Sequence, residues 1–403
     1  MAEFIIHGPE LTTVTGTEGD DRLIYFLESG PGGMLLQLPT PNPLGGYDGV
    51  FLPTDGDPTH FTGIENISFV DQVGGDDTLT TGGGDDVLTG GGGRDVLTGG
   101  AGIDTLSGGN RNDILRGGDD GDWVHGGNGN DRMFGDVGND SLIGGNGNDR
   151  LFGGTGNDFI DGGDGDDLIY GGVGEDFIIA DAGTDVVLAG AGKDMVEISF
   201  DAIKTIDGGG ARDMLTVFHF TEAPAGMRLT FDMTTGAFTA TDAIMAASTA
   251  TNFEDFAFQG DINVKMLGTD VANQLFGSVG NDILRGGDGR DALFGEDGND
   301  LLRGNQKADL LNGGLGDDIM IGGAGADTFI FAGGLDQITD FKNDVDTIQV
   351  LGGLVPFGTT VQDLVDSATV VDGNTVIALD ADNVLTIKGL TDAALLLDDL
   401  LIV

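Results

Sequence analysis

The stretch GGNGNDRMF, residues 126–134, is one unit of a nine-residue repeat that determines the fold. Its pattern is G-G-x-G-x-D-x-U-x, where U is an apolar residue. Fourteen such units run through residues 72–197, and seven run through residues 268–330. Aspartate holds the sixth position in 20 of these 21 units, and Asn273 holds it in the other. A period kept this strictly predicts a stack of repeats, each packed on its neighbours.

The unit divides into a strand part and a turn part. In x-U-x, the alternation of a strand points U to one side and its neighbours to the other. The segment G-G-x-G-x-D is expected to form a sharp turn, because glycine adopts positive φ at little cost. Two units complete one coil, so alternate units should stack about 4.8 Å apart.

Stacking of alternate units places each aspartate almost above the aspartate two units earlier. Two carboxylates at that distance repel by about 1 kcal/mol in water and by several times more in a drier turn. A hard cation between successive turns reverses the sign, and the turns add backbone carbonyl ligands. Six to eight oxygen ligands with irregular geometry suit Ca²⁺ better than Mg²⁺. One ion between alternate units gives about 12 sites in the first array and about 5 in the second.

The predicted calcium ligands are the aspartates at the sixth position. A solvated acidic face would explain neither the glycines nor the row of U residues. The predicted set is Asp77, Asp86, Asp95, Asp104, Asp113, Asp122, Asp131, Asp140, Asp149, Asp158, Asp167, Asp176, Asp185, Asp194, Asp282, Asp291, Asp300, Asp309, Asp318 and Asp327.

Composition supports a chain that needs cations. Its 403 residues include 68 acidic and 17 basic side chains, for a net charge of −51, and 76 glycines. Such a composition favours disorder unless the charge is cancelled, so folding and calcium binding are expected to be one event. Nucleic acid is not expected as a partner, because so acidic a surface repels phosphates.

Other classes of site and segment are also disfavoured. The chain has no cysteine, which excludes disulfides, and its four scattered histidines disfavour zinc. No apolar run reaches transmembrane length. Residues 1–15 lack a basic n-region, so they are not expected to be a Sec signal peptide.

The sequence pattern indicates that one module of unit, insert and array is used twice. Single units begin at Gly16 and Gly208, and an irregular segment follows each. Within these inserts RLIYF resembles MLTVF, and IENISF resembles FEDFAF. Short runs of alternating apolar and polar residues favour strands over helices or a disordered linker.

We therefore expect an all-β protein with two roll blocks, β-rich inserts and a cap. After residue 330 the glycine repeat stops, where a solenoid must cover its open edge. The expected segments are an N-terminal β-rich segment with one isolated repeat (1–71), a first roll (72–197), a β-rich insert (198–267), a second roll (268–330), and a C-terminal cap with an export signal (331–403).

Some units lack the glycine at the fourth position, and we expect their calcium sites to differ from the others. Arg111, Asp120 and Lys307 replace the glycine at the fourth position, where positive φ is strained for other residues. Arg111 and Lys307 also bring a cation, so weak or empty sites are expected near them.

Outward aromatic positions recur in every second unit and should form rows. They either stack along the roll or lie under an insert, or they form an exposed apolar strip that binds another module, subunit or surface. The rows are Phe134, Phe152, Tyr170 and Leu188 in the first array and Phe276 and Phe294 in the second.

These repeats resemble those of the RTX (repeats-in-toxin, hemolysin-type calcium-binding) proteins. The resemblance implies a parallel β-roll that holds one Ca²⁺ between adjacent turns through the repeat aspartates and nearby carbonyls. Residues 329–351 resemble the cap that follows the roll in secreted RTX proteases. The last segment, VLTIKGLTDAALLLDDLLIV, resembles the uncleaved signal of type I secretion. It implies the type I secretion machinery as a partner, with the protein secreted or at the cell surface of a Gram-negative bacterium.

No catalytic motif accompanies the repeats. H-E-x-x-H and G-x-S-x-G are absent, as is the long apolar helical region of a pore-forming toxin. The expected role is therefore non-enzymatic, as a surface-layer, matrix or adhesive component that self-assembles or contacts a cell surface or polysaccharide. The alternatives are a calcium-dependent polysaccharide-active enzyme and a glycan- or cell-binding module, each with its site on the inserts.

Overall fold

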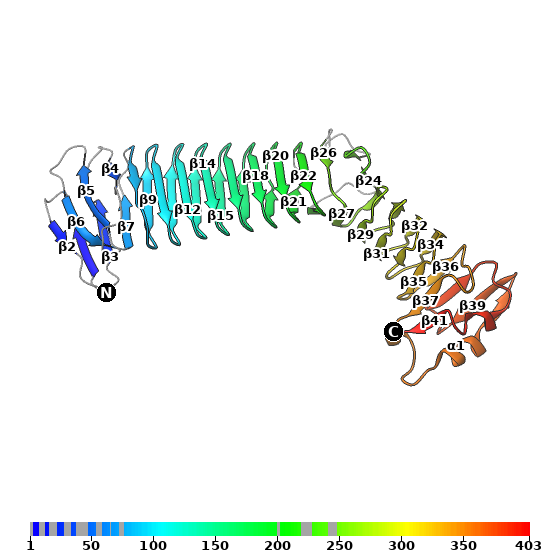
Figure 1. Cartoon of the computed structure of the whole chain (residues 1–403). Coiled ribbons are helices and arrows are strands. Elements are labelled where there is room, and N and C mark those ends of the chain that lie inside the picture. The colour runs from blue at the N-terminus through cyan, green and yellow to red at the C-terminus, as the bar shows by residue number, and fades with distance from the viewer. Residues whose placement is uncertain are drawn as a thin grey trace. The chain divides into compact units, whose positions relative to one another are not determined.

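The computed structural model describes residues 76–199, 202–218, 228–240 and 248–403 together with seven N-terminal strands (Figure 1). The chain divides into two compact units, residues 1–211 and 212–403. The described part is almost entirely β-structure, as predicted. The N-terminal strands are β1 (Glu3–His7), β2 (Thr13–Thr15), β3 (Arg22–Leu27), β4 (Met34–Gln37), β5 (Tyr47–Pro53), β6 (Thr59–Ile64) and β7 (Asn66–Asp71).

The first unit contains a roll of two parallel sheets, and successive strands of the roll alternate between them. Each strand from β8 to β20 pairs with the strand two elements later, as in β14 and β16, where Met133 lies beside Leu151. This pairing confirms that two repeats make one coil. The roll strands are β8 (Thr78–Thr80), β9 (Val87–Gly92), β10 (Val96–Ala101), β11 (Thr105–Asn110), β12 (Ile114–Asp119), β13 (Trp123–Asn128), β14 (Arg132–Val137), β15 (Ser141–Asn146), β16 (Arg150–Thr155), β17 (Phe159–Asp164), β18 (Leu168–Val173), β19 (Phe177–Ala180), β20 (Val186–Ala191), β21 (Met195–Ser199) and β22 (Thr205–Gly210).

The strands are longer than the sequence predicted. Most follow the pattern x-U-x-G-G-x, so the turn keeps only the fourth to sixth positions. The prediction that G-G-x-G-x-D is all turn was wrong, because the second glycine bends the chain without leaving the ladder. Gly127 and Gly145 have φ of 110° and 104°, yet they still pair with each other across β13 and β15. Such a bend inside a ladder resembles a bulge.

Alternation along these strands points the sixth, eighth and first positions of each unit inward. The U residues Met133, Leu151 and Ile169 are fully buried, and the same holds for the U row of the second unit. The core of each roll is therefore a stack of U side chains. The aspartate of each unit faces the same interior, because it lies two residues before U.

The second unit repeats this architecture around its own roll. Leu284 of β30 pairs with Leu302 of β32, again two repeats apart. Its strands are β23 (Met214–Phe218), β24 (Arg228–Asp232), β25 (Ala237–Ala240), β26 (Thr249–Thr251), β27 (Asp255–Gln259), β28 (Asn263–Leu267), β29 (Gln274–Val279), β30 (Ile283–Gly287), β31 (Ala292–Asp297), β32 (Leu301–Gln306), β33 (Leu310–Asn312), β34 (Ile319–Ala324), β35 (Thr328–Phe331), β36 (Leu335–Ile338), β37 (Thr347–Val350), β38 (Thr369–Val371), β39 (Asn374–Ala378), β40 (Val384–Ile387) and β41 (Leu400–Ile402).

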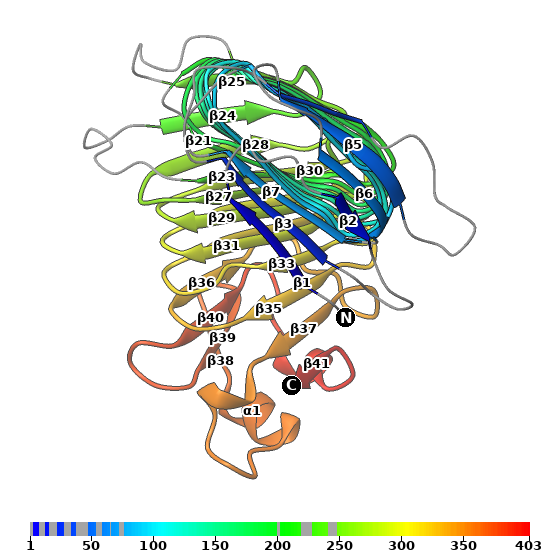
Figure 2. The same cartoon turned by 90° about the vertical axis from the view of Figure 1, so that its left-hand side faces the viewer.

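The two inserts share a topology, which supports a duplicated module. β3 pairs in parallel with β7, and β23 pairs with β27 in the equivalent register. In each insert the first strand of an antiparallel hairpin, β4–β5 or β24–β25, pairs in parallel with a later strand, β8 in the first roll or β28 just before the second roll. Figure 2 shows β1, β3 and β7 side by side. Residues 16–21 of the predicted isolated repeat lie outside the described residues.

Two further strands stack on the second roll after the glycine repeat ends. β36 pairs with β34, and β37 pairs with β35. β40 and β41 then cover their free edges, as a cap should. Helix α1 (Val361–Ser367) begins with a capping box between Thr360 and Asp363, and η1 (Gly352–Leu354) and η2 (Ala393–Leu396) are short 3₁₀ turns. Within the described residues, none of the helices has the length and apolar character needed to span a membrane.

Candidate metal centre

All twenty predicted aspartates are buried, each with 3% or less of its surface exposed. They form ladders inside the two rolls. The backbone amide of Asp131 donates to Oδ1 of Asp149 at 2.7 Å, and the amide of Asp282 donates to Oδ1 of Asp300 at 2.7 Å. The predicted stacking of alternate units is therefore confirmed, and a solvated acidic face is not what the structure shows. Their role as metal ligands stays a prediction.

In many of these residues the second carboxylate oxygen has no such contact. Among the described residues, a buried Oδ2 without a hydrogen-bond partner occurs in turn after turn. A buried charged oxygen in this state is costly, so the row favours a counter-cation in the same space. These Oδ2 atoms include those of Asp104, Asp113, Asp122, Asp131, Asp140, Asp149, Asp158, Asp176, Asp291, Asp300, Asp309, Asp318 and Asp327.

The first glycine of each unit makes room for this oxygen. A Cβ on Gly144 would lie 2.6 Å from Oδ2 of Asp149 and 2.3 Å from the carbonyl oxygen of Gly162 in the next turn. A Cβ on Gly153 would be similarly close to Asp158 and to the carbonyl of the next turn. The glycine therefore keeps open a cradle lined by carboxylate and carbonyl oxygens. This donor set fits calcium, which prefers oxygen ligands of both kinds.

Burial also changes the acidity of the ladder. It raises the pKa of Asp113 to about 8, and the charges of Asp95 and Asp131 add to the rise, although the Asp95 amide opposes it. The pKa of Asp300 rises to about 8 and that of Asp149 to about 6, again chiefly through burial. Without a counter-cation, the folded ladder therefore favours protonated carboxyl groups.

Two further aspartates extend the ladder of the second unit into the segment that the sequence pattern predicts as a cap. Asp336 accepts from the amide of Asp318 at 3.0 Å, and Asp346 accepts from the amide of Asp327 at 3.0 Å. Burial raises the pKa of Asp336 to about 8. The length of two repeats separates Asp336 from Asp318, which was a usable signal, whereas one extra residue separates Asp346 from Asp327.

Two predicted positions have other partners. Asn273, the exception at the sixth position, donates from Nδ2 to the carbonyl of Glu254 at 2.6 Å. Asp185 differs from the other predicted ligands because its Oδ2 accepts from Nζ of Lys204 at 2.6 Å. The repeat pattern alone does not point to Lys204.

The irregular fourth positions adopt the expected backbone conformation. Arg111, Asp120 and Lys307 have φ of 77°, 75° and 69°, which costs roughly 1–2 kcal/mol in a residue with a Cβ. The side chains of Arg111 and Lys307 are exposed. The weak or empty sites expected near them stay a prediction.

The outward aromatic rows are stacked. Ring centroids lie 5.0 Å apart between Phe134 and Phe152 and 4.9 Å apart between Phe152 and Tyr170. Phe276 and Phe294 stack at 4.7 Å in the second unit. Stacking along the roll is thus present, and binding of a further surface to these rows stays a prediction.

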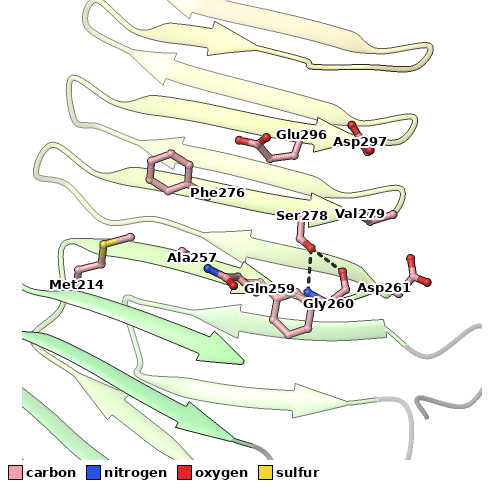
Figure 3. Close-up of a pocket in the computed structure, with 11 residues that line it drawn as sticks. Met214, Ala257, Gln259, Gly260, Asp261, Phe276, Ser278, Val279, Glu296 and Asp297 are labelled. Atoms are coloured by element: carbon pink, nitrogen blue, oxygen red, sulfur yellow. Dashed lines mark hydrogen bonds between the residues drawn. The ribbon is translucent and has the colours of Figure 1, made fainter. Parts of the chain in front are cut away.

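A groove of about 700 Å³ lies against one sheet of the second unit (Figure 3). Phe276 and Ser278 come from β29, and Ser278 is fixed because its Oγ donates to the carbonyl of Gly260 at 2.5 Å. Gln259, at the end of β27, also faces the groove, with Glu296 from β31.

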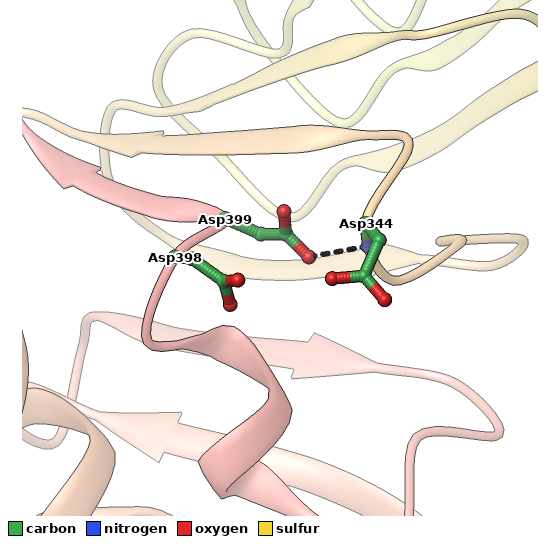
Figure 4. Close-up of side chains that lie close together, drawn as sticks. All are labelled: Asp344, Asp398 and Asp399. Carbon is green, nitrogen blue, oxygen red and sulfur yellow. Dashed lines mark hydrogen bonds between the residues drawn. The ribbon is translucent and has the colours of Figure 1, made fainter.

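Three acidic residues also meet in the C-terminal segment (Figure 4). Ligand atoms of Asp344, Asp398 and Asp399 lie within 4.8 Å of one another. Oδ2 of Asp399 accepts from the backbone amide of Asp344 at 2.8 Å. This contact closes a loop, and Asp344 and Asp398 are exposed, so we assign no ion to the group.

Comparison with known proteins agrees with the geometry of the rolls. A family model for the RTX calcium-binding nonapeptide repeat matches residues 73–106, 107–142, 143–178, 169–196, 267–302, 294–329 and 303–338. No curated protein sequence matches the chain significantly.

A solved structure, the extracellular lipase LipA from Serratia marcescens, is similar at 16% identity and a TM-score of 0.27 over 75% of this chain. The chain spans 40% of that lipase chain, and so low a score carries no argument about activity. The family match, the parallel rolls and the stacked aspartates together show that residues 73–196 and 267–338 of this chain are RTX hemolysin-type calcium-binding nonapeptide repeats.

Proposed function

We propose that this RTX protein is an extracellular calcium-binding protein that folds on Ca²⁺ after type I secretion from a Gram-negative bacterium. It then serves as a surface-layer, matrix or adhesive component rather than as an enzyme. The observation that carries the proposal is the row of buried Oδ2 atoms without hydrogen-bond partners among the described residues. RTX repeats are typical of extracellular proteins exported in this way, which supports the location.

Charge explains why export and folding would be separate steps. About 17 ions, one between each pair of stacked units, would carry about +34 against the net charge of −51. Without them the repulsion within the ladders opposes the roll, so the chain stays extended enough to be exported. Calcium outside the cell then supplies the missing charge, and binding energy becomes folding energy.

The test compares the full chain with and without calcium. At neutral pH, circular dichroism should show β-structure and cooperative melting only with calcium, and electron microscopy should show sheets or filaments under the same condition. A chelator-stripped chain that keeps full β-structure at neutral pH would refute calcium-dependent folding. Calcium-loaded protein that stays monomeric and dispersed would refute self-assembly while leaving the folding proposal intact.

A second candidate function rests on the groove of the second unit. Its aromatic Phe276, the amide of Gln259 and the carboxylate of Glu296 are groups that bind sugars, and β27 belongs to the insert. A screen against acidic and neutral glycans in calcium distinguishes the alternatives. Turnover would identify a polysaccharide-active enzyme, and binding without turnover would identify a glycan- or cell-binding module. Phe276→Ala should abolish either activity if the groove is the site.

A further inference from the structure

A lysine is buried at the end of the first roll. The side chain of Lys204 is 0% exposed, and that of Asp185 is 1% exposed. Nζ of Lys204 donates to Oδ2 of Asp185 at 2.6 Å and to the carbonyl oxygens of Asp181 and Gly183, both at 2.5 Å. A buried ammonium is costly unless it is fully paired, and here its three protons meet three oxygens.

The lysine stands where the next ladder aspartate belongs. Asp185 comes directly before Val186, and Lys204 comes directly before Thr205, the residue that pairs with Val186 across β20 and β22. Below it the ladder is regular, because the amide of Asp167 donates to Oδ1 of Asp185 at 2.9 Å. The interval from Val186 to its partner Thr205 is one residue longer than two repeats. Because of this inserted residue, the nine-residue period does not align Lys204 with Asp185.

The three oxygens around Nζ are repeat positions. They are the carbonyls of the second and fourth positions and the Oδ2 of the sixth position of one unit, residues 180–188. In regular turns the equivalent Oδ2 atoms of Asp158 and Asp176 are buried without a hydrogen-bond partner in the described structure. The ammonium therefore gives Oδ2 of Asp185 the positively charged partner that the Oδ2 atoms of Asp158 and Asp176 lack in the described structure.

The end of the second roll offers a contrast. Nζ of Lys342 donates to the carbonyl of Gly323, which is also the second position of its unit. That contact is exposed, and Oδ2 of Asp327 in the same unit keeps no hydrogen-bond partner among the described residues. In the described part of the chain, only the Lys204 ammonium meets both carbonyls and the carboxylate of one unit.

We propose that the Lys204 ammonium takes the place of one calcium ion and closes the last turn of the first roll without metal. The proposal rests on calcium being the ion of the regular turns. A tethered cation cannot dissociate, so this turn stays neutralised at any calcium concentration. It also gives the chain one ion fewer than its stacked turns would otherwise hold.

The decisive experiment counts ions. Wild type and Lys204→Asp are saturated with calcium, freed of loose ions by dialysis, and analysed for calcium per folded chain. Lys204→Asp restores a ladder aspartate and should bind one ion more than wild type. An equal count in a folded variant overturns the proposal, and so does a variant that fails to fold at saturating calcium. If wild type itself binds no calcium, the proposed function fails instead.

Two further variants complete the test. Lys193→Asp makes the same change of charge at an exposed position of the preceding unit and should leave the count unchanged. An extra ion there would mean that added charge alone raises the count, against the proposal. Lys204→Met removes the ammonium and should lower the melting temperature at saturating calcium well below that of Lys193→Asp. Equal melting temperatures would show that the buried ammonium neutralises nothing.

Discussion

Within a single repeat unit, three positions accept only a narrow range of residue types. Gly147 has φ of 139°, Asp149 has a buried carboxylate whose Oδ1 binds the previous turn, and Leu151 is fully buried. The first requires glycine, the second an acid of short reach, and the third an apolar side chain of fixed volume. Each requirement recurs because every turn lies against a copy of itself.

Replacing Gly147 with alanine should destabilise the first roll. The new Cβ would lie 1.8 Å from the carbonyl oxygen of Gly129, and the backbone angle is strained for alanine. The melting temperature in calcium should fall, and calcium should be lost from the adjacent turns. Gly210→Ala in β22 is the matched control, since nothing lies within 4 Å of its Cβ position. Equal melting temperatures of the two variants would contradict the claim that this position requires glycine.

Replacing Leu151 with alanine should lower the free energy of unfolding by about 2–5 kcal/mol, because it leaves a cavity in a fully buried row. Denaturant unfolding in saturating calcium measures the loss. Arg150→Ala, one residue away on the exposed face, should change that free energy much less. If both variants unfold alike, the U row is not the core.

The ladder as an element should respond to pH. Unfolded aspartates titrate near a pKa of about 3.9. Burial raises the pKa of Asp113 to about 8 and that of Asp149 to about 6 in the fold. A raised folded pKa stabilises the fold below the unfolded pKa, and this stabilisation is lost as pH rises through the folded value. The metal-free chain should therefore gain β-structure in acid and lose it between about pH 4 and 8.

Circular dichroism against pH in chelator checks this. Calcium affinity should rise over the same range, because ions must displace the protons. A metal-free chain that has more β-structure at pH 8 than at pH 4 would contradict the electrostatic account of the ladder.

The aromatic row should stabilise the face on which it stacks. Phe152→Ser breaks two stacked contacts, to Phe134 and Tyr170, each worth about 0.5–1.5 kcal/mol beyond the area lost. Unfolding in calcium should therefore be easier than for Trp123→Ser, because residue Trp123 is 61% exposed. If Phe152→Ser instead abolishes an association at unchanged stability and calcium affinity, the row is a binding strip.

The part of the structure that the sequence alone predicts differs between elements. The period placed Asp149 and Leu151 correctly, since stacking of every second unit is a matter of counting. The same counting does not identify Lys204 and Asp346 as ladder positions. One inserted residue lengthens the step before each of them, so the 18-residue period no longer shows which residues pair. Strand length was also missed, because the glycines that suggest a turn remain inside the ladder. The occupant of the groove depends on side chains brought together by the insert, which no period encodes.

For the whole molecule, the net charge of −51 calls for cations, and the geometry of the oxygen cradles should make folding selective for calcium. Mg²⁺ demands near-octahedral geometry and gives up its waters reluctantly, whereas a cradle of carbonyl and carboxylate oxygens tolerates irregular coordination. Titration followed by circular dichroism should show folding at calcium concentrations where magnesium has little effect. Equal midpoints would mean that general screening, not site binding, drives the fold.

The uniformity of the coils poses a problem of alignment for a growing roll. A strand that docked one whole coil too early would meet almost the same neighbours as in its proper place, so regular turns cannot tell right from wrong. The steps from Val186 to Thr205 and from Thr328 to Thr347 are each longer by a single residue than those beside them. A strand that follows such a longer step can pair in register with only one neighbour. Each longer step should therefore fix the alignment of the coils around it.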